Sequence, residues 1–138
     1  MRQRMLIQPS CPPKPTHFRG SSRGDLRELP KPVRVTFGRA IWAAQTGRKV
    51  EEATPLQGFG GAGVLEVVED YTSGTYRAVY TLRFEGVVYE LHVFQKKSRR
   101  GIETPADDMA LIRQRLREAE EHYTNEVLPT RRARGGEG

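Results

Sequence analysis

Alternating apolar and polar positions over residues 75–96 predict a β-hairpin. Two runs rich in β-branched and aromatic residues, TYRAVYTLRF and VVYELHVF, flank Glu85-Gly86, a pair that suits a tight turn. If Phe84 pairs with Val87, each strand places successive side chains on opposite faces of the sheet. In that register Tyr80 faces Leu91, and Arg77 faces Phe94.

The two faces of this hairpin differ in character. One is predicted to be core and carries Tyr76, Ala78, Tyr80, Leu82, Phe84, Val87, Tyr89, Leu91 and Val93. The other carries Arg77, Val79, Thr81, Arg83, Val88, Glu90, His92 and Phe94, with Lys96 following. A shift of one residue would expose the aromatic side chains to water, so the hydrophobic pattern favours this assignment. We therefore expect Arg77, His92 and Lys96 on one basic face, with Lys97, Arg99 and Arg100 at the end of the strand.

Three helices are predicted from apolar residues spaced three and four apart. A short helix begins at Ser21 or Ser22, either of which can cap it, and runs through Leu29. A second begins at Pro32 and ends at Thr46-Gly47, with a buried stripe of Val33, Phe37, Ala40, Ile41 and Ala44. A third begins after Thr104-Pro105 and buries Met109, Ile112, Leu116, Ala119 and Tyr123. Arg113 and Arg117 share an exposed face of this third helix.

Short strands at residues 16–19 and 64–69 complete an element order of β-α-α-β-β-β-α. This order predicts an α+β fold in which a small antiparallel sheet has helices packed on one face and a basic open face. The proline-rich residues 1–15 are expected to form a disordered leader, and residues 128–138 a disordered basic tail. The folded domain is then expected to span residues 16–127.

The charge and cysteine content narrow the choice of partners. A formal net charge of +6 favours an anionic partner, and the lack of a long apolar run favours nucleic acid over a membrane. Cys11 is the single cysteine, which excludes a disulfide within the chain and a zinc site built from cysteines. The apolar segment that follows Arg2 and Arg4 is too short for a signal peptide. The expected location is the cytoplasm.

Residues 58–63, GFGGAG, match the glycine spacing of a dinucleotide-binding loop. In that loop the glycines follow a strand and open a helix, whereas here they precede the strand predicted at residues 64–69. A kinase loop does precede a strand, but a chain of 138 residues is too short for a kinase domain. We therefore interpret the glycines as a flexible approach to the sheet.

The candidate chemistry is that of phosphate in RNA. His17, His92 and His122 lie on separate predicted elements without a nucleophile motif, so a Ser-His-Asp hydrolase is not indicated. No spacing typical of a metal site occurs, and no cofactor is expected. A dense cationic sheet edge with one histidine and aromatic residues suits phosphate stabilisation. Attack by the 2′-hydroxyl of RNA on its own phosphate requires a base, an acid and cations, without a metal.

The residues that carry this chemistry resemble a known family. YRAVY at residues 76–80, LHVFQKKS at residues 91–98 and the helix after Thr104-Pro105 resemble the HigB-like, phage-derived branch of the RelE/ParE toxin superfamily. GSS at residues 20–22, DL at residues 25–26 and PLQGFG at residues 55–60 fit the same branch. The resemblance implies a ribosome-associated endoribonuclease that cuts messenger RNA. It also implies a toxin–antitoxin hetero-oligomer, in which an antitoxin with a helix-turn-helix domain inhibits the toxin.

The resemblance also assigns roles to single positions. Arg77 matches the strand arginine that contacts the scissile phosphate, Lys96 and Lys97 match the F-x-K-K segment, and His92 matches the histidine that often precedes it. These four are the candidate catalytic residues. The candidate RNA-binding residues are Arg83, Arg99, Arg100, Arg113 and Arg117. Several relatives place an acid–base tyrosine or histidine at the very C-terminus. Here the nearest candidate is Tyr123, so the general acid and base stay open.

Two other functions fit the same sequence. The ParE branch shares the fold but acts on DNA gyrase without cutting RNA, and a basic RNA- or protein-binding module needs no catalysis. Primer extension on messenger RNA, with and without ribosomes, separates the three.

Overall fold

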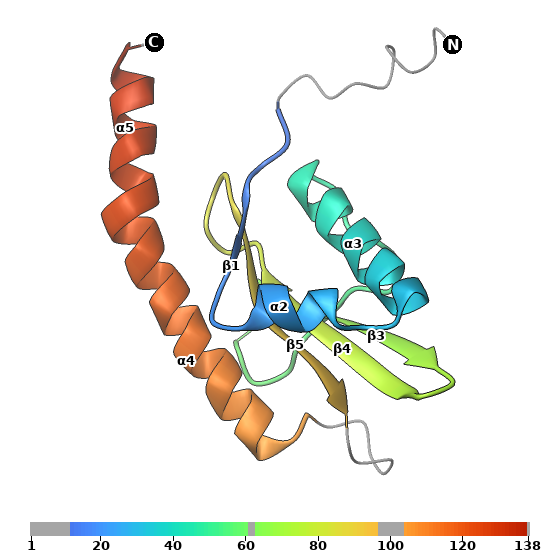
Figure 1. Cartoon of the computed structure of the whole chain (residues 1–138). Helices are drawn as coiled ribbons and strands as arrows, with labels where there is room; N and C mark the ends of the chain where they lie inside the picture. Colours follow the sequence, from blue (N-terminus) through green and yellow to red (C-terminus); the bar gives the residue numbers. More distant parts are fainter. Residues whose placement is uncertain (1–11, 61–62, 97–103, 138) are drawn as a thin grey trace, which may run out of the picture.

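The computed structural model describes residues 12–60, 63–96 and 104–137 of the chain (Figure 1). Its strands are β1 (Thr16–Phe18), β2 (Thr54–Pro55), β3 (Val64–Tyr71), β4 (Gly74–Thr81) and β5 (Val88–Lys96). Its helices are α2 (Ser22–Arg27), α3 (Lys31–Gln45), α4 (Ala106–His122) and α5 (Leu128–Glu137), with a π-helical turn, η1 (Tyr123–Val127), between the last two. The strands form one sheet of five in the order β1-β5-β4-β3-β2, which confirms the α+β class.

The sheet is mostly antiparallel, but one edge differs from the prediction. Strands β2 to β5 pair antiparallel with their neighbours, whereas β1 pairs parallel with β5 and places Thr16 opposite Val88. Parallel neighbours require a long crossover connection. Here the crossover from β1 to β5 includes α2, α3 and the other three strands. The expectation of an antiparallel sheet therefore holds for four strands and is wrong for β1.

The hairpin of β4 and β5 follows the predicted register only in part. Arg77 faces Phe94 as predicted, but a β-bulge next to Val79 and Tyr80 shifts the pairing, so that Tyr80 faces Glu90. Leu91 is the extra residue of the bulge, which makes the predicted pairing of Tyr80 with Leu91 wrong. An extra residue reverses the alternation of the side chains that lie beyond the bulge. The alternation of apolar and polar residues in the sequence does not reveal where such a bulge occurs.

The first face of the sheet packs against α3. The predicted stripe of this helix is confirmed, because Val33, Phe37, Ala40 and Ala44 lie in one buried cluster with Leu65, Val67, Tyr76, Ala78, Tyr80, Val88 and Val93. The bulge explains three errors of the predicted core face. Val87, Tyr89 and Leu91 lie in the buried cluster on the second face, whereas Val88 lies in the cluster that packs against α3 on the first face.

Helix α4 covers part of the second face, so the expectation that all helices pack on one face is wrong. Its predicted stripe is confirmed: Ile112 and Ala119 are buried together with Val79, Tyr89 and Leu91, and Met109, Leu116 and Tyr123 pack against this cluster. Figure 1 shows α3 and α4 on opposite sides of the strands. An amphipathic helix must bury its apolar stripe. Because α3 occupies the first face, α4 packs on the second.

The two ends also differ from the disorder expected there. Residues 128–137 form α5, and Pro129 is accommodated because the wider π-helical turn of η1 directly precedes the helix. Near the N-terminus, the Lys14 amide donates to the Gln45 carbonyl at 2.9 Å, and the Val88 amide donates to the Pro15 carbonyl. Residues 1–11 of the expected leader lie outside the described residues. Within the described part of the chain, no helix combines the length and apolarity that a membrane span requires.

Candidate functional site

The second face of the sheet arranges nine side chains in three rows across β3, β4 and β5. The rows are Glu66, Val79 and His92, then Val68, Arg77 and Phe94, then Asp70, Thr75 and Lys96. Neighbouring strands lie about 4.8 Å apart, and same-face residues along a strand lie about 6.7 Å apart. Arg77 is therefore the centre of the array, with Glu66 and Lys96 at opposite corners. The second face brings together three of the predicted site residues: Arg77, His92 and Lys96.

Arg77 is buried and held by two described partners. Its Nη1 atom lies 2.5 Å from Glu66 Oε2 and donates to Thr104 Oγ1 at 3.2 Å. The side chain of Arg77 is only 5% exposed and that of Glu66 12%. A buried guanidinium requires a counter-charge, and Glu66 supplies it from the next strand. Sequence analysis missed Glu66, although it alternates with buried Leu65 and Val67.

His92 is surrounded by protein groups. Its Nε2 atom lies 2.8 Å from Asp108 Oδ1, its Nδ1 atom lies 3.3 Å from Arg115 Nη1, and its ring stacks on Phe94 with centroids 4.4 Å apart. Because arginine can only donate, Nδ1 is the acceptor and Nε2 carries the hydrogen. Burial lowers the pKa of His92, so the neutral ring predominates at pH 7. With both nitrogens engaged, this arrangement favours a positioning role for His92 over proton transfer.

Arg115, which sequence analysis did not single out, joins α4 to the sheet and to α2. It is buried, and its guanidinium donates to the Leu91 carbonyl at 3.0 Å and to Ser21 Oγ at 3.3 Å. Gly20 has a φ of +54°, and a Cβ at this position would lie 2.5 Å from Arg115 Nε. The Gly20-Ser21 pair therefore provides the space and the acceptor that this arginine needs.

Lys96 shares the second face with Arg77, whereas the other predicted cations are dispersed. Lys96 is half-buried and faces Thr75, whose hydroxyl donates to Asp70 at 2.8 Å. Arg83 is exposed beyond β4, donates to the Phe59 carbonyl at 3.1 Å and lines a pocket of about 500 Å³ beside Lys49. Lys97, Arg99 and Arg100 lie outside the described residues. Their predicted roles stay predictions.

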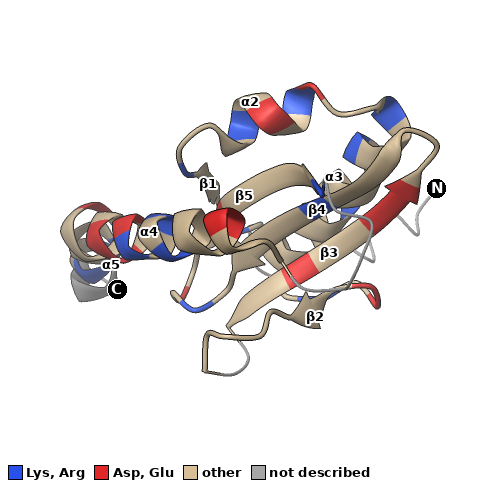
Figure 2. Ribbon diagram, turned by 90° about the horizontal axis from the view of Figure 1, so that it is seen from below, with Lys and Arg blue, Asp and Glu red and all other residues tan. Residues whose placement is uncertain are grey.

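Arg113 and Arg117 are exposed on α4, as predicted. Arg113 lies over the ring of Phe59, 5.4 Å from its centroid, whereas Arg117 shares a shallow hollow with Glu120 and Glu121. Figure 2 shows acidic and basic segments alternating along α4. Nearby carboxylates weaken attraction to phosphate, so the helix does not present a uniformly basic surface. RNA binding by these two arginines stays a prediction.

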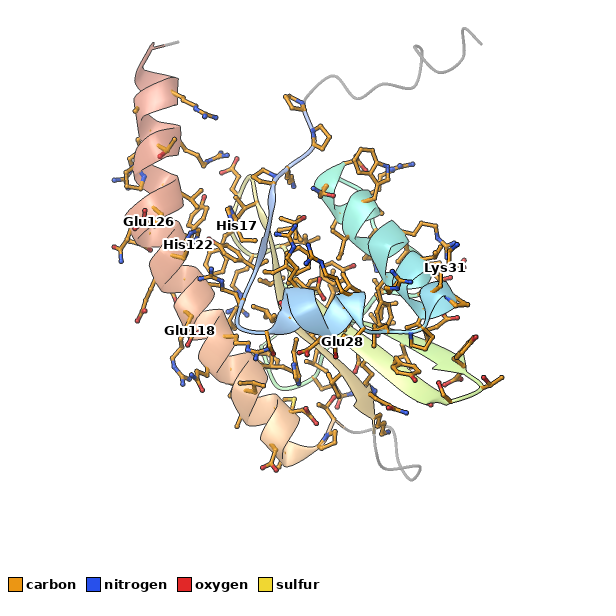
Figure 3. All side chains as sticks on the ribbon, in the orientation of Figure 1. His17, Glu28, Lys31, Glu118, His122 and Glu126 are labelled. Carbon is orange, nitrogen blue, oxygen red and sulfur yellow. The ribbon has the colours of Figure 1, made fainter. Side chains whose placement is uncertain are left out.

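A second cluster joins residues that the sequence places on separate elements. Tyr89 Oη lies 2.7 Å from His122 Nδ1, and the rings of His17 and His122 lie 4.8 Å apart; Figure 3 shows these two histidines side by side. Burial lowers the pKa of His17, and the charges of His122 and Arg19 act in the same direction.

Tyr123, the sequence candidate for the general acid or base, donates to the Glu85 carbonyl at 2.9 Å. Since Glu85 follows the end of β4, this bond directs Tyr123 away from Arg77. No three His, Cys, Asp or Glu side chains of the described residues are grouped as metal ligands.

The chain is similar to several known proteins. A family model described as phage derived protein Gp49-like matches residues 24–117. No curated protein matches the sequence. The toxin–antitoxin complex RelBE2 from Mycobacterium tuberculosis has a chain that is 22% identical over 66% of this chain and 100% of its own, with a TM-score of 0.43. A mutant of the E. coli toxin RelE in the free state is 18% identical over 64% and 88%, with a TM-score of 0.47. The isolated E. coli RelE toxin is 20% identical over 72% and 97%, with a TM-score of 0.45.

Proposed function

Because the chain belongs to the phage-derived Gp49-like family, we propose that it is the toxin of a toxin–antitoxin pair and cuts messenger RNA on the ribosome. The observation that carries this proposal is the placement of Arg77 at the centre of the second face, between Glu66 and Lys96. Arg77 lies in YRAVY and Lys96 lies in LHVFQKKS, the two motifs that resemble the HigB-like toxins. This resemblance supports the choice of RNA as substrate.

Arg77 binds the scissile phosphate in the proposed reaction. A guanidinium matches two phosphate oxygens at once, and a preorganised cation stabilises the extra negative charge that develops on phosphorus. Val68, which is 38% exposed, and the half-buried Phe94 are the neighbours of Arg77 in its row. RNA would approach Arg77 from the Val68 side, and its phosphate would take the place of Glu66 at one edge of the guanidinium.

Glu66 is the proposed general base, and Lys96 the proposed acid. Glu66 removes the proton of the 2′-hydroxyl, the 2′-oxygen forms a bond to phosphorus, and the bond from phosphorus to the 5′-oxygen breaks. Lys96 gives a proton to the departing 5′-oxygen. The products are a 2′,3′-cyclic phosphate and a 5′-hydroxyl. Because Glu66 and Lys96 transfer both protons, the step needs no metal. His92 is left out of the proton transfers because Asp108 and Arg115 engage its two ring nitrogens.

Primer extension on ribosome-bound messenger RNA tests this proposal. The parent is expected to cut the messenger RNA. The cleavage rate of Arg77→Ala should be lower by a factor of about 10²–10³, the usual effect of removing one preorganised donor. Arg27→Ala, which removes an exposed arginine from α2, is the matched control and should cut like the parent. Because Arg77→Ala leaves Glu66 buried without its counter-charge, the double variant Glu66→Gln/Arg77→Met is compared with it, and thermal melting checks that both fold.

The outcomes separate the proposed function from the alternatives. An Arg77→Ala protein that cuts as fast as the parent would place the reaction elsewhere. A parent that leaves messenger RNA intact, with and without ribosomes, would favour a gyrase-directed toxin or a binding module. We further propose an antitoxin with a helix-turn-helix domain as the inhibitory partner, on the basis of the same motif resemblance.

A further inference from the structure

The outward side of α3 carries two large apolar side chains. Val35 is 54% exposed and Trp42 is 49% exposed, and their spacing of two helical turns places them on one stripe. Gly38 lies between them, and a Cβ built at this position would meet no atom within 4 Å. Single exposed apolar residues are common on protein surfaces. Two in line with a glycine between them form a ridge with a central notch, which a second helix could occupy.

The charged side chains of α3 are all basic. Helix α3 contains no Asp or Glu, and Lys31 and Arg39 lie one turn before and one turn after Val35. None of the ion pairs within the described residues involves α3. Lys31 lies at the start of α3 on the side turned away from α4 (Figure 3). The ridge is therefore an apolar strip with a cationic border.

We propose that the ridge formed by Val35, Gly38 and Trp42 docks an acidic amphipathic helix of a partner protein. Tryptophan and arginine are frequent anchors of protein interfaces, and a notch at Gly38 allows a partner helix to approach closely. The partner's apolar side chains would pack on Val35 and Trp42, and its carboxylates would reach Lys31 and Arg39. A second copy of this chain is disfavoured, because the same ridge would bring like charges together. Identifying the partner as the antitoxin rests on the proposed function.

The position of the ridge separates docking from catalysis. Helix α3 packs on the first face of the sheet, whereas Glu66, Arg77 and Lys96 lie on the second. A helix bound to α3 alone would not touch Arg77. Substitutions on the ridge should therefore weaken partner binding without changing RNA cleavage.

Trp42 is the only tryptophan in the chain, so its fluorescence reports directly on the ridge. The full chain is titrated with three synthetic helical peptides of equal length. The first has a leucine stripe bordered by glutamates, the second has lysines in place of the glutamates, and the third has serines in place of the leucines. Only the first is expected to move the emission of Trp42 to shorter wavelength in a saturable way, and added salt should weaken its binding.

A charge reversal tests the border of the ridge. Arg39→Glu is expected to weaken binding of the glutamate peptide by about tenfold and to improve binding of the lysine peptide, since opposite charges now face each other. Arg132→Glu, a reversal of an exposed arginine on α5, is the matched control and should leave the binding of both peptides unchanged. Thermal melting confirms that both variants are folded.

Several results would overturn the inference. Equal responses to all three peptides, or equal effects of Arg39→Glu and Arg132→Glu, would show that the peptides are attracted non-specifically. A saturable shift with single-stranded RNA but not with the glutamate peptide would make the ridge a nucleic-acid surface. A shift on deletion of residues 1–11, without any peptide, would show that the chain covers its own ridge. Cleavage is measured on the same proteins, so a parent that fails to cut RNA would refute the proposed function and leave the docking result standing.

Discussion

Arg77 reaches diagonally from β4 to Glu66 on β3, and the two side chains form an ion pair almost out of contact with water. The contact places a carboxylate beside the guanidinium that would hold the phosphate. A phosphate bound at Arg77 would then have a proton acceptor next to it. This relationship is the reason for assigning the general base to Glu66 and not to His92 or Tyr123.

Replacing Glu66 with Gln should lower the rate of RNA cleavage by about 10²–10⁴, the usual contribution of a general base. Gln keeps an oxygen that can accept from Arg77 but removes its counter-charge, so the melting temperature should fall, and the rates are compared at a temperature where thermal melting shows the variant to be folded. Single-turnover cleavage rates at one fixed pH provide the measurement, with Glu69→Gln on the same strand as control. A variant that cuts at the parent's rate would exclude Glu66 as the base.

His92→Gln should make the stability of the protein less sensitive to acid. Burial lowers the pKa of His92 in the folded state, so the folded state binds a proton less readily than the unfolded state does. The stabilising contribution is therefore present above the unfolded pKa of about 6.5 and is lost as the pH falls through the folded value. Urea unfolding between pH 4.5 and 7.5 should show that the free energy of unfolding falls less toward low pH in the variant than in the parent. An equal dependence of this free energy on pH in both proteins would contradict the assignment.

Glu90→Gln should stabilise the protein near neutral pH. Glu90 is fully buried and faces Tyr80, and its carboxylate oxygens have no hydrogen-bond partner among the described residues. Burial raises the pKa of Glu90, so its contribution to stability is present below the unfolded pKa and is lost as the pH rises. We expect a gain of about 1–3 kcal/mol at pH 7 and a smaller gain near pH 4.5, measured by urea unfolding. A loss of stability at pH 7 would indicate that Glu90 is paired.

Gly20→Ala and Gly24→Ala form a matched pair on either side of the start of α2. An alanine at position 20 combines a positive φ with a Cβ 2.5 Å from the Arg115 guanidinium, so we expect a loss of about 2 kcal/mol or more. Gly24 lies inside α2 with no atom within 4 Å of a Cβ, and alanine there should add about 0.5–1 kcal/mol. Thermal melting of both variants measures the contrast. Equal effects would show that Arg115 does not depend on Gly20.

Local patterns in the sequence predicted the elements well. The stripes of α3 and α4 follow the helical period, and Arg77 faces Phe94 because that part of the hairpin alternates without interruption. Such patterns depend on neighbours within one element, which a single sequence displays directly. The bulge at Leu91 is the limit of this reasoning, because one additional residue reversed the faces of Val87, Val88 and Tyr89 while leaving the composition of the strand unchanged.

The sequence by itself determined that Arg77 and Lys96 share a face and that two amphipathic helices pack against one sheet, but not that they pack on opposite faces. Only the tertiary structure decided that Glu66 holds Arg77, that Asp108 and Arg115 engage His92, and that His17 lies beside His122. Periodicity determines the side of an element on which a residue lies. The partner on another element depends on strand register and on how helices dock, and these are settled by the packing of the whole core.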